Sequence, residues 1–179
     1  MIKRDRNNPL EMSTKYNSAR YTLFALVAFS FINLFAISFG DRYFLFSSYF
    51  TQITTSVFYE IAVEEGVSAV IWVGIAIGTV LLVPYLLAAI FSKKHVGWMI
   101  AALVLFGVDS VLFFYDVIIG LAGGYFGSIV DVAFHVWALV DLILGVKHGV
   151  TAKKNPPAPV AVPTPKAEAP SKTSAPVNL

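Results

Sequence analysis

The sequence predicts an all-α integral membrane protein: a helical bundle with four transmembrane helices and one amphipathic helix that lies in the membrane interface. Three observations support this fold class. Hydrophobic residues make up 57% of the 179 residues, and the mean hydropathy of +0.72 exceeds that of a typical globular protein. The apolar residues gather in long uncharged runs, and the lysines and arginines gather in short clusters between the runs. Lipid is the solvent that such runs require.

The first predicted span covers residues 21–39 and follows a basic segment, residues 1–20, which we expect in the cytoplasm. A helix needs about 20 apolar residues to cross a bilayer, and this stretch meets that requirement. The end of the stretch, Ala36-Ile37-Ser38, resembles a signal-peptide cleavage site, but the apolar region of a signal peptide is only about 7 to 15 residues long. We therefore expect a retained span.

Residues 43–65 are apolar but interrupted by many hydroxyl groups. Apolar residues recur along this segment at three- and four-residue steps: Phe46, Phe50, Ile53, Val57 and Ile61. This spacing is typical of an amphipathic helix in the interface. A fifth span would move the later lysines outside, against the positive-inside rule. The sequence favours the interfacial helix and leaves a re-entrant segment or a fifth span as alternatives.

Three further spans, at residues 67–91, 96–121 and 128–146, complete a transmembrane domain over residues 21–150. Within the first of these, Gly74 and Gly78 form a small-xxx-small pattern. Such a pattern lets another helix approach closely, either in the same chain or in a homo-oligomer. Pro84 removes a backbone donor from the same span, so we expect a kink or hinge there.

The basic residues predict the orientation. Lysines and arginines lie before the first span, between the second and the third, and after the fourth. The positive-inside rule therefore places both termini on the cytoplasmic side of a bacterial cell (inner) membrane. Residues 151–179 are rich in proline, alanine and lysine and cannot bury enough apolar surface to fold. We expect a disordered cytoplasmic tail, either simply solvated or a docking segment for a soluble partner.

Ionisable residues inside the spans are the candidate functional residues, because their burial in a membrane is costly. There are five: Asp109, Asp116, Asp131, His135 and Asp141. Counting about 1.5 Å per residue along two antiparallel helices places Asp109 and His135 at the same depth, near the middle of the membrane. We expect these two side chains to pair and the others to extend a polar track.

This track has functional and structural interpretations. A histidine beside a carboxylate exchanges protons near neutral pH, which suits proton or cation carriage. Metal ligation by Asp109, Asp131 and His135 is a weaker alternative, because an Asp/His pair four residues apart often occurs by chance. Structurally, the same groups would form interhelical hydrogen bonds worth about 1 kcal/mol each, and Asp131 would cap its helix. We expect no metal and no cofactor.

The sequence contains no motif of a soluble enzyme. An intramembrane Ser/His hydrolase would need Ser110 beside His135 together with an oxyanion site, and only fragments of this arrangement are present. The net charge is only +2 and the chain has no cysteine, so we expect neither a nucleic-acid partner nor thiol chemistry. We predict that the protein is not an enzyme.

Parts of the sequence resemble a family of small multi-pass membrane proteins of Gram-positive bacteria, over about the first 150 residues. The segments that carry the resemblance are Asn17-Ser18-Ala19-Arg20, Tyr43-Phe44-Leu45-Phe46-Ser47, Phe91-Ser92-Lys93-Lys94, Val96-Gly97-Trp98, Phe106-Gly107-Val108-Asp109, Ser128-Ile129-Val130-Asp131 and Phe134-His135-Val136-Trp137. The family is uncharacterised, so the resemblance implies a membrane bundle and a bacterial source but no activity.

Two functions follow from these observations. The sequence favours an architectural or accessory membrane protein, embedded in the lipid bilayer, that works alone, as a homo-oligomer, or with a cytoplasmic protein bound to its tail. The alternative is a small proton- or cation-coupled carrier or channel that uses the Asp/His track.

Overall fold

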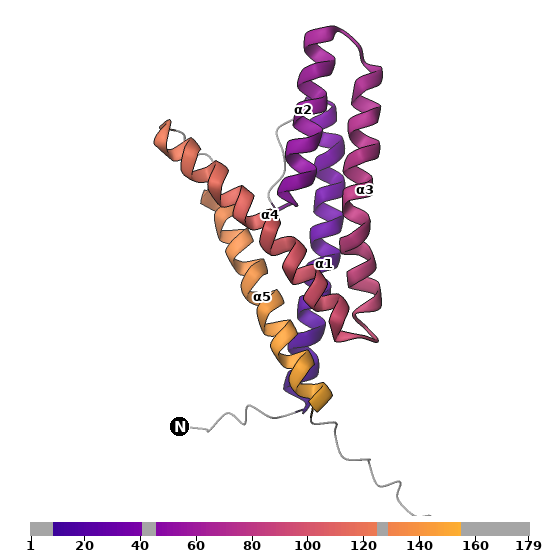
Figure 1. Cartoon of the computed structure of the whole chain (residues 1–179), viewed down its shortest axis with the longest axis vertical. Coiled ribbons are helices and arrows are strands. Elements are labelled where there is room, and N and C mark those ends of the chain that lie inside the picture. The colour runs from indigo at the N-terminus through magenta and orange to yellow at the C-terminus, as the bar shows by residue number, and fades with distance from the viewer. Residues whose placement is uncertain (1–8, 41–45, 125–128, 155–179) are drawn as a thin grey trace, which may run out of the picture.

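A computed structural model describes residues 9–40, 46–124 and 129–154. All regular structure in this part of the chain is helical, in the order α1 (Pro9–Ser38), α2 (Tyr49–Glu65), α3 (Ala69–Phe91), α4 (Val96–Ala122) and α5 (Ile129–Lys154) (Figure 1). Four of these helices, α1, α3, α4 and α5, are long and apolar enough to cross a membrane. The predicted all-α class, with four spans and one shorter helix, is confirmed.

Two helices extend beyond their predicted bounds. α1 begins at Pro9, before residue 21, and a proline suits the first turn of a helix because the N–H it lacks has no partner there. α5 continues past residue 146 to Lys154, where Lys153 and Lys154 place positive charge at the negative end of the helix dipole. The first residues of the predicted tail, 151–154, are therefore helical, and residues 155–179 lie outside the described residues.

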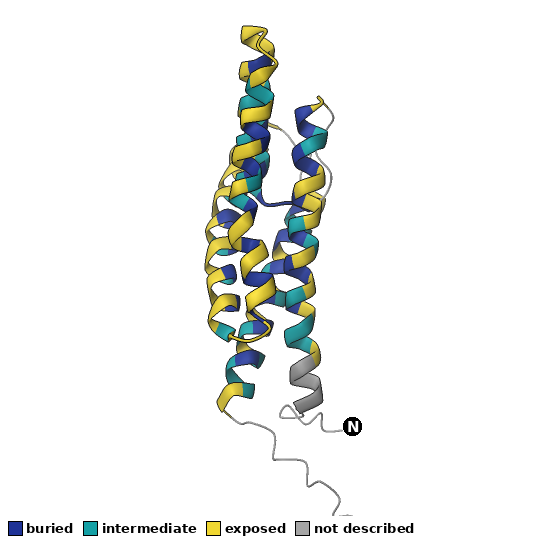
Figure 2. Ribbon diagram, turned by 90° about the vertical axis from the view of Figure 1, so that its right-hand side faces the viewer, coloured by how far each residue is buried: buried dark blue, intermediate teal, exposed yellow. Residues whose placement is uncertain are grey.

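The outward faces of the helices, coloured as exposed in Figure 2, carry many large apolar side chains. Val80, Val111 and Ile118 are each exposed by more than 60%, at 66%, 67% and 63%. Polar side chains, in contrast, are found in the interior, where Ser30, Asn33 and Asp109 are at most 1% exposed. A soluble monomer rarely exposes so much continuous apolar surface, whereas lipid solvates it. The distribution is that of a multi-pass membrane protein.

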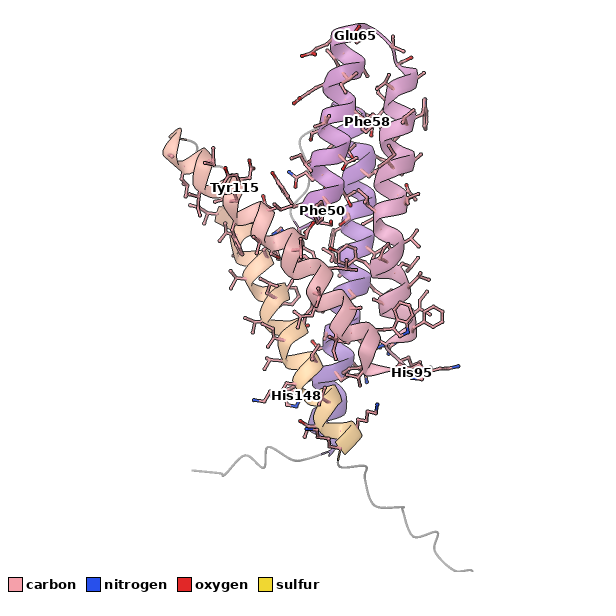
Figure 3. All side chains as sticks on the ribbon, viewed as in Figure 1. Phe50, Phe58, Glu65, His95, Tyr115 and His148 are labelled. Atoms are coloured by element: carbon pink, nitrogen blue, oxygen red, sulfur yellow. The ribbon has the colours of Figure 1, made fainter. Side chains whose placement is uncertain are left out.

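α1 lies at the centre of the bundle and packs against α2, α3 and α5, while α4 packs against α3 and α5. The start of α1, the turn between α3 and α4, and the end of α5 lie at one end, which carries His95 and His148 (Figures 1 and 3). Glu65 and the turn between α2 and α3 lie at the other end (Figure 3). We call these the basic end and the acidic end, after Lys93, Lys94, Lys147, Lys153 and Lys154 on one side and Glu60, Glu64 and Glu65 on the other.

α2 differs in direction from the interfacial helix that the sequence predicts. It runs alongside α1 and α3 instead of across the end of the bundle (Figure 1). Its hydroxyl-bearing side, with Thr51 and Thr55, is buried against its neighbours, and its apolar side faces outward. The two faces of the amphipathic helix exist, but the polar face lies against protein and the apolar face points outward. Thr55 donates its hydroxyl to the carbonyl of Thr51, whereas Thr51 Oγ1 is buried without a hydrogen-bond partner.

Glycines allow α3 to approach α1 and α2 closely, and they allow α5 to approach α1. A Cβ at Gly78 would lie 2.7 Å from Leu34 Cδ1, and a Cβ at Gly74 would collide with Phe58 of α2. On α5, side chains at Gly145 and Gly149 would collide with Ala19 and Tyr16 of α1. The Gly74 and Gly78 pattern therefore serves contacts within the chain. Pro84 lies on the exposed side of α3, and the helix continues through it.

Candidate functional site

The centre of the bundle contains a short break in helical structure. Phe46, Ser47 and Ser48 are buried and non-helical, and they lead directly into α2. Phe46 has a positive φ of 71°, a conformation that costs a bulky residue about 1–3 kcal/mol. Its ring packs against three aromatic rings that hold it in place, those of Phe29, Phe134 and Trp137. Non-helical backbone at this depth is stable only when protein satisfies its polar groups.

Asp109 of α4 binds the hydroxyl of Ser48 and the first two N–H groups of α2. Its Oδ1 accepts the N–H of Phe50 at 2.8 Å and the hydroxyl of Ser48 at 2.9 Å. Its Oδ2 accepts the N–H of Tyr49 at 3.0 Å. The first N–H groups of a helix have no partner within the helix, and the helix dipole is positive there. A fully buried carboxylate thus caps the start of α2 from a different helix.

Other helices complete the connection to the break. Ser30 of α1 accepts the N–H of Ser48 at 2.8 Å, and Asp131 of α5 accepts the N–H of Phe46 at 3.5 Å. The hydroxyl of Tyr85 on α3 is hydrogen-bonded to the side chain of Ser48. Every spanning helix therefore contributes a polar group to this one segment.

Asp116 binds the same end of α2. Its carboxylate is hydrogen-bonded to the hydroxyl of Tyr49, whose N–H is held by Asp109. The phenol is the donor of this hydrogen bond, because a carboxylate can only accept. Two carboxylates seven residues apart on α4 hold the first residue of α2.

His135 lies beside Asp109 but makes no hydrogen bond to it. His135 Nε2 is 3.9 Å from Asp109 Oδ2 and has no hydrogen-bond partner, although the side chain is only 3% exposed. The other ring nitrogen, Nδ1, is 3.1 Å from the carbonyl oxygen of Asp131. The imidazole is stacked between Phe106 and Phe113, with centroid distances of 5.4 and 3.9 Å. The two residues that the sequence places at one depth thus lie side by side, 3.9 Å apart at their nearest nitrogen and oxygen atoms.

Asp141 is separate from this group. Its carboxylate accepts hydrogen bonds from two hydroxyl groups of α1, that of Thr22 at 2.6 Å and that of Ser18 at 3.3 Å. Buried apolar side chains fill the interior between His135 and the basic end: Met99, Ala102, Phe106, Ala138 and Leu142. The predicted track is thus divided: four of its residues surround the start of α2, and the fifth joins α1 to α5.

The chain matches no protein-family model, no curated protein and no solved structure. The interpretation of the site therefore depends on its geometry. Within the described ranges, no three His, Asp or Glu side chains are grouped as a metal ion would require. Ser110 donates its hydroxyl to the carbonyl of Phe106 on its own helix at 2.7 Å, and among the described residues no hydrogen bond joins it to His135. The geometry gives neither the metal site nor the Ser/His pair any support.

A second polar connection, which the sequence analysis missed, lies at the basic end. Arg20 of α1 donates to Ser92 Oγ at 3.2 Å and to the carbonyl of Ala89 at 3.4 Å. Tyr16 donates its hydroxyl to the carbonyl of Ser92 at 2.6 Å. A cation is favourable at a helix C-terminus, and these groups cap the last turn of α3.

Several other residues of the site were also missed, and some of them carry a sequence signal. Ser48, directly before an apolar periodic run, is a standard N-cap residue, and Gly145 with Gly149 repeats the spacing of Gly74 and Gly78. Nothing in the sequence indicates that Ser30 binds the N–H of Ser48, because one serine in an apolar run does not reveal its partner.

Proposed function

We propose that this protein is an architectural or accessory protein of a bacterial cytoplasmic membrane and not an enzyme. One observation carries the proposal: Asp109, the most deeply buried carboxylate of the predicted track, is fully used in holding α2. A carrier site needs a group that can exchange its partners, whereas Asp109 accepts three hydrogen bonds from the protein itself. The geometry therefore supports a structural role for this residue.

The distribution of charge supports the proposed orientation. The start of α1, the turn after α3 and the end of α5 share the basic end, which the positive-inside rule assigns to the cytoplasm. The acidic end, with Glu60, Glu64 and Glu65, would face outward. The C-terminal end of α5, with Lys153 and Lys154, would then lie on the cytoplasmic side. The proline-rich segment that follows α5 in the sequence is the proposed docking segment for a soluble protein.

Flux measurements test the architectural role. Purified protein would be reconstituted in liposomes, and proton and monovalent-cation flux would be compared between the wild type and Asp109→Asn across neutral pH. We expect no flux in either protein and a lower unfolding temperature for the variant. A wild-type flux that the substitution abolishes would overturn the architectural proposal. Asp141→Asn is the matched control, because it also removes one charge from a span but lies outside the site.

A second candidate function, a proton- or cation-coupled carrier, is favoured by a different observation. His135 Nε2 is buried and without a hydrogen-bond partner, and it faces Asp109 at 3.9 Å. Histidine changes its protonation near neutral pH, which a proton carrier requires. The apolar layer between His135 and the basic end would have to open during transport, so this candidate needs a second conformation.

A further inference from the structure

The contacts of His135 determine which of its nitrogens carry protons. A carbonyl oxygen can only accept, so the 3.1 Å contact between Nδ1 and the Asp131 carbonyl requires a proton on Nδ1. In a neutral imidazole the other nitrogen is then a bare lone pair. That nitrogen, Nε2, faces a carboxylate oxygen of Asp109, which also can only accept. Without one further proton, two lone pairs would face each other in a buried site.

We propose that Asp109 and His135 form a proton-binding site, in which His135 is a buried imidazolium facing an ionised Asp109, and that the bound proton locks α4 and α5 to the start of α2. This goes beyond the architectural role, and it does not require that anything is transported. The ligand of the site is a proton.

The hydrogen bonds of Asp109 assign the proton to His135. Three donors already point at the Asp109 carboxylate, two of them backbone N–H groups at the positive end of α2. These donors stabilise the ionised carboxylate. A proton on Asp109 would weaken all three bonds, because a neutral carboxyl accepts hydrogen bonds less strongly than a carboxylate. A proton on Nε2 weakens no existing hydrogen bond, because that nitrogen has no partner.

The rings around His135 suit a cation. Phe106 and Phe113 lie nearly parallel to the imidazole, at interplanar angles of 11° and 10°, one on each side. The negative face of an aromatic ring attracts a cation within about 6 Å of its centroid, most strongly where water is excluded. The imidazolium would thus be stabilised by Asp109 at its edge and by aromatic faces on both sides.

The other groups of the site add no positive charge. Over the described residues that contact the site, the titratable groups are Asp131 on α5, Tyr85 on α3, Tyr49 on α2 and Asp116 on α4. The contribution of α1 is Ser30, which does not titrate. His135 is therefore the group that can balance Asp109, and loss of its proton would leave that carboxylate facing a lone pair.

Nitrogen NMR of the full-length protein tests this inference directly. The chain contains three histidines, so ¹⁵N-histidine labelling in nanodiscs gives few signals, and His135→Gln and His95→Gln assign them. We expect His135 to show two protonated nitrogens at neutral pH in the wild type. A neutral His135 with an unprotonated Nε2 would overturn the proposal, and this wild-type spectrum decides it even where a variant fails to fold.

Two charge variants sharpen the test. Asp109→Asn should cause the imidazolium signal of His135 to be lost at neutral pH, whereas Asp141→Asn should retain it. If the imidazolium signal persisted unchanged in a folded Asp109→Asn protein, the ion pair would be excluded. Absence of flux in liposomes bears only on the carrier function, so the two proposals fail independently.

Discussion

Ser48 holds the N-cap position of α2, yet its hydroxyl donates to Asp109 at 2.9 Å and makes no capping bond to its own helix. An N-cap serine ordinarily accepts from the N–H two or three residues onward. Here the carboxylate of Asp109, 61 positions further along the chain, accepts hydrogen bonds from the start of α2 in place of the serine. The start of α2 is therefore stable only when α4 is in place.

We expect Asp109→Asn to destabilise the bundle by about 3 kcal/mol, because an amide cannot accept all three hydrogen bonds and a buried ion pair loses one partner. Thermal or denaturant unfolding in detergent, followed by circular dichroism, measures this change. Asp141→Asn should cost less than about 1 kcal/mol, since Asp141 is only half-buried and bonds hydroxyl groups. Equal losses in the two variants would show that Asp109 is not the structural centre.

The direction of α2 predicts a gradient of depth. Ile53, Val57 and Ile61 share its exposed face, at 42, 45 and 40% exposure, and successive helical residues rise about 1.5 Å. Spin labels on single cysteines at these positions should become steadily shallower from Ile53 to Ile61, as measured by collision with oxygen and with a water-soluble nickel complex. An in-plane helix would give one constant depth. The chain has no cysteine of its own, so each label is unique.

The contact between α1 and α5 predicts a reciprocal pair of substitutions. A Cβ at Gly145 would collide with Ala19 Cβ, so Gly145→Ala should cost about 1–3 kcal/mol. Ala19→Gly in the same chain should restore most of that loss, a coupling that a double-mutant cycle of unfolding free energies measures. Gly107→Ala is the control, because nothing lies within 4 Å of the added methyl group there. A loss in the control as large as that of Gly145→Ala would refute the steric explanation.

Arg20→Gln should lower stability by about 1 kcal/mol through loss of the cap on α3. The same unfolding assay measures the change. Lys93→Gln removes an equal charge from an exposed position at the same end and should have little effect. If both substitutions had the same effect, general charge at the basic end, and not the cap, would be responsible.

The fold class and the spans could be predicted from the sequence because long apolar runs between clusters of basic residues indicate helices that are solvated by lipid. That Asp109 and His135 lie at the same level of two neighbouring helices could also be predicted, since the rise of a helix is fixed. The direction of α2 could not. Periodicity shows that Ile53 and Thr55 lie on different faces, but it does not show which face meets protein and which meets lipid.

The partners of the polar residues were equally hidden from the sequence. Ser30 binds the N–H of Ser48, and Asp141 binds the hydroxyls of Ser18 and Thr22, across long distances along the chain. Which helices adjoin is set by close approaches such as that of Gly145 and Ala19. These depend on side-chain shapes over the whole bundle, so a single sequence does not reveal them.

The cap on α2 also has a consequence for the order in which the chain is made. A ribosome delivers α1 and α2 to the membrane well before Asp109, which is 60 positions beyond Tyr49. Until α4 arrives, the first N–H groups of α2 have no acceptor in the hydrocarbon, and α2 must wait nearer to water. We therefore expect α2 to take its final place late in biogenesis, after the helices that follow it in the chain.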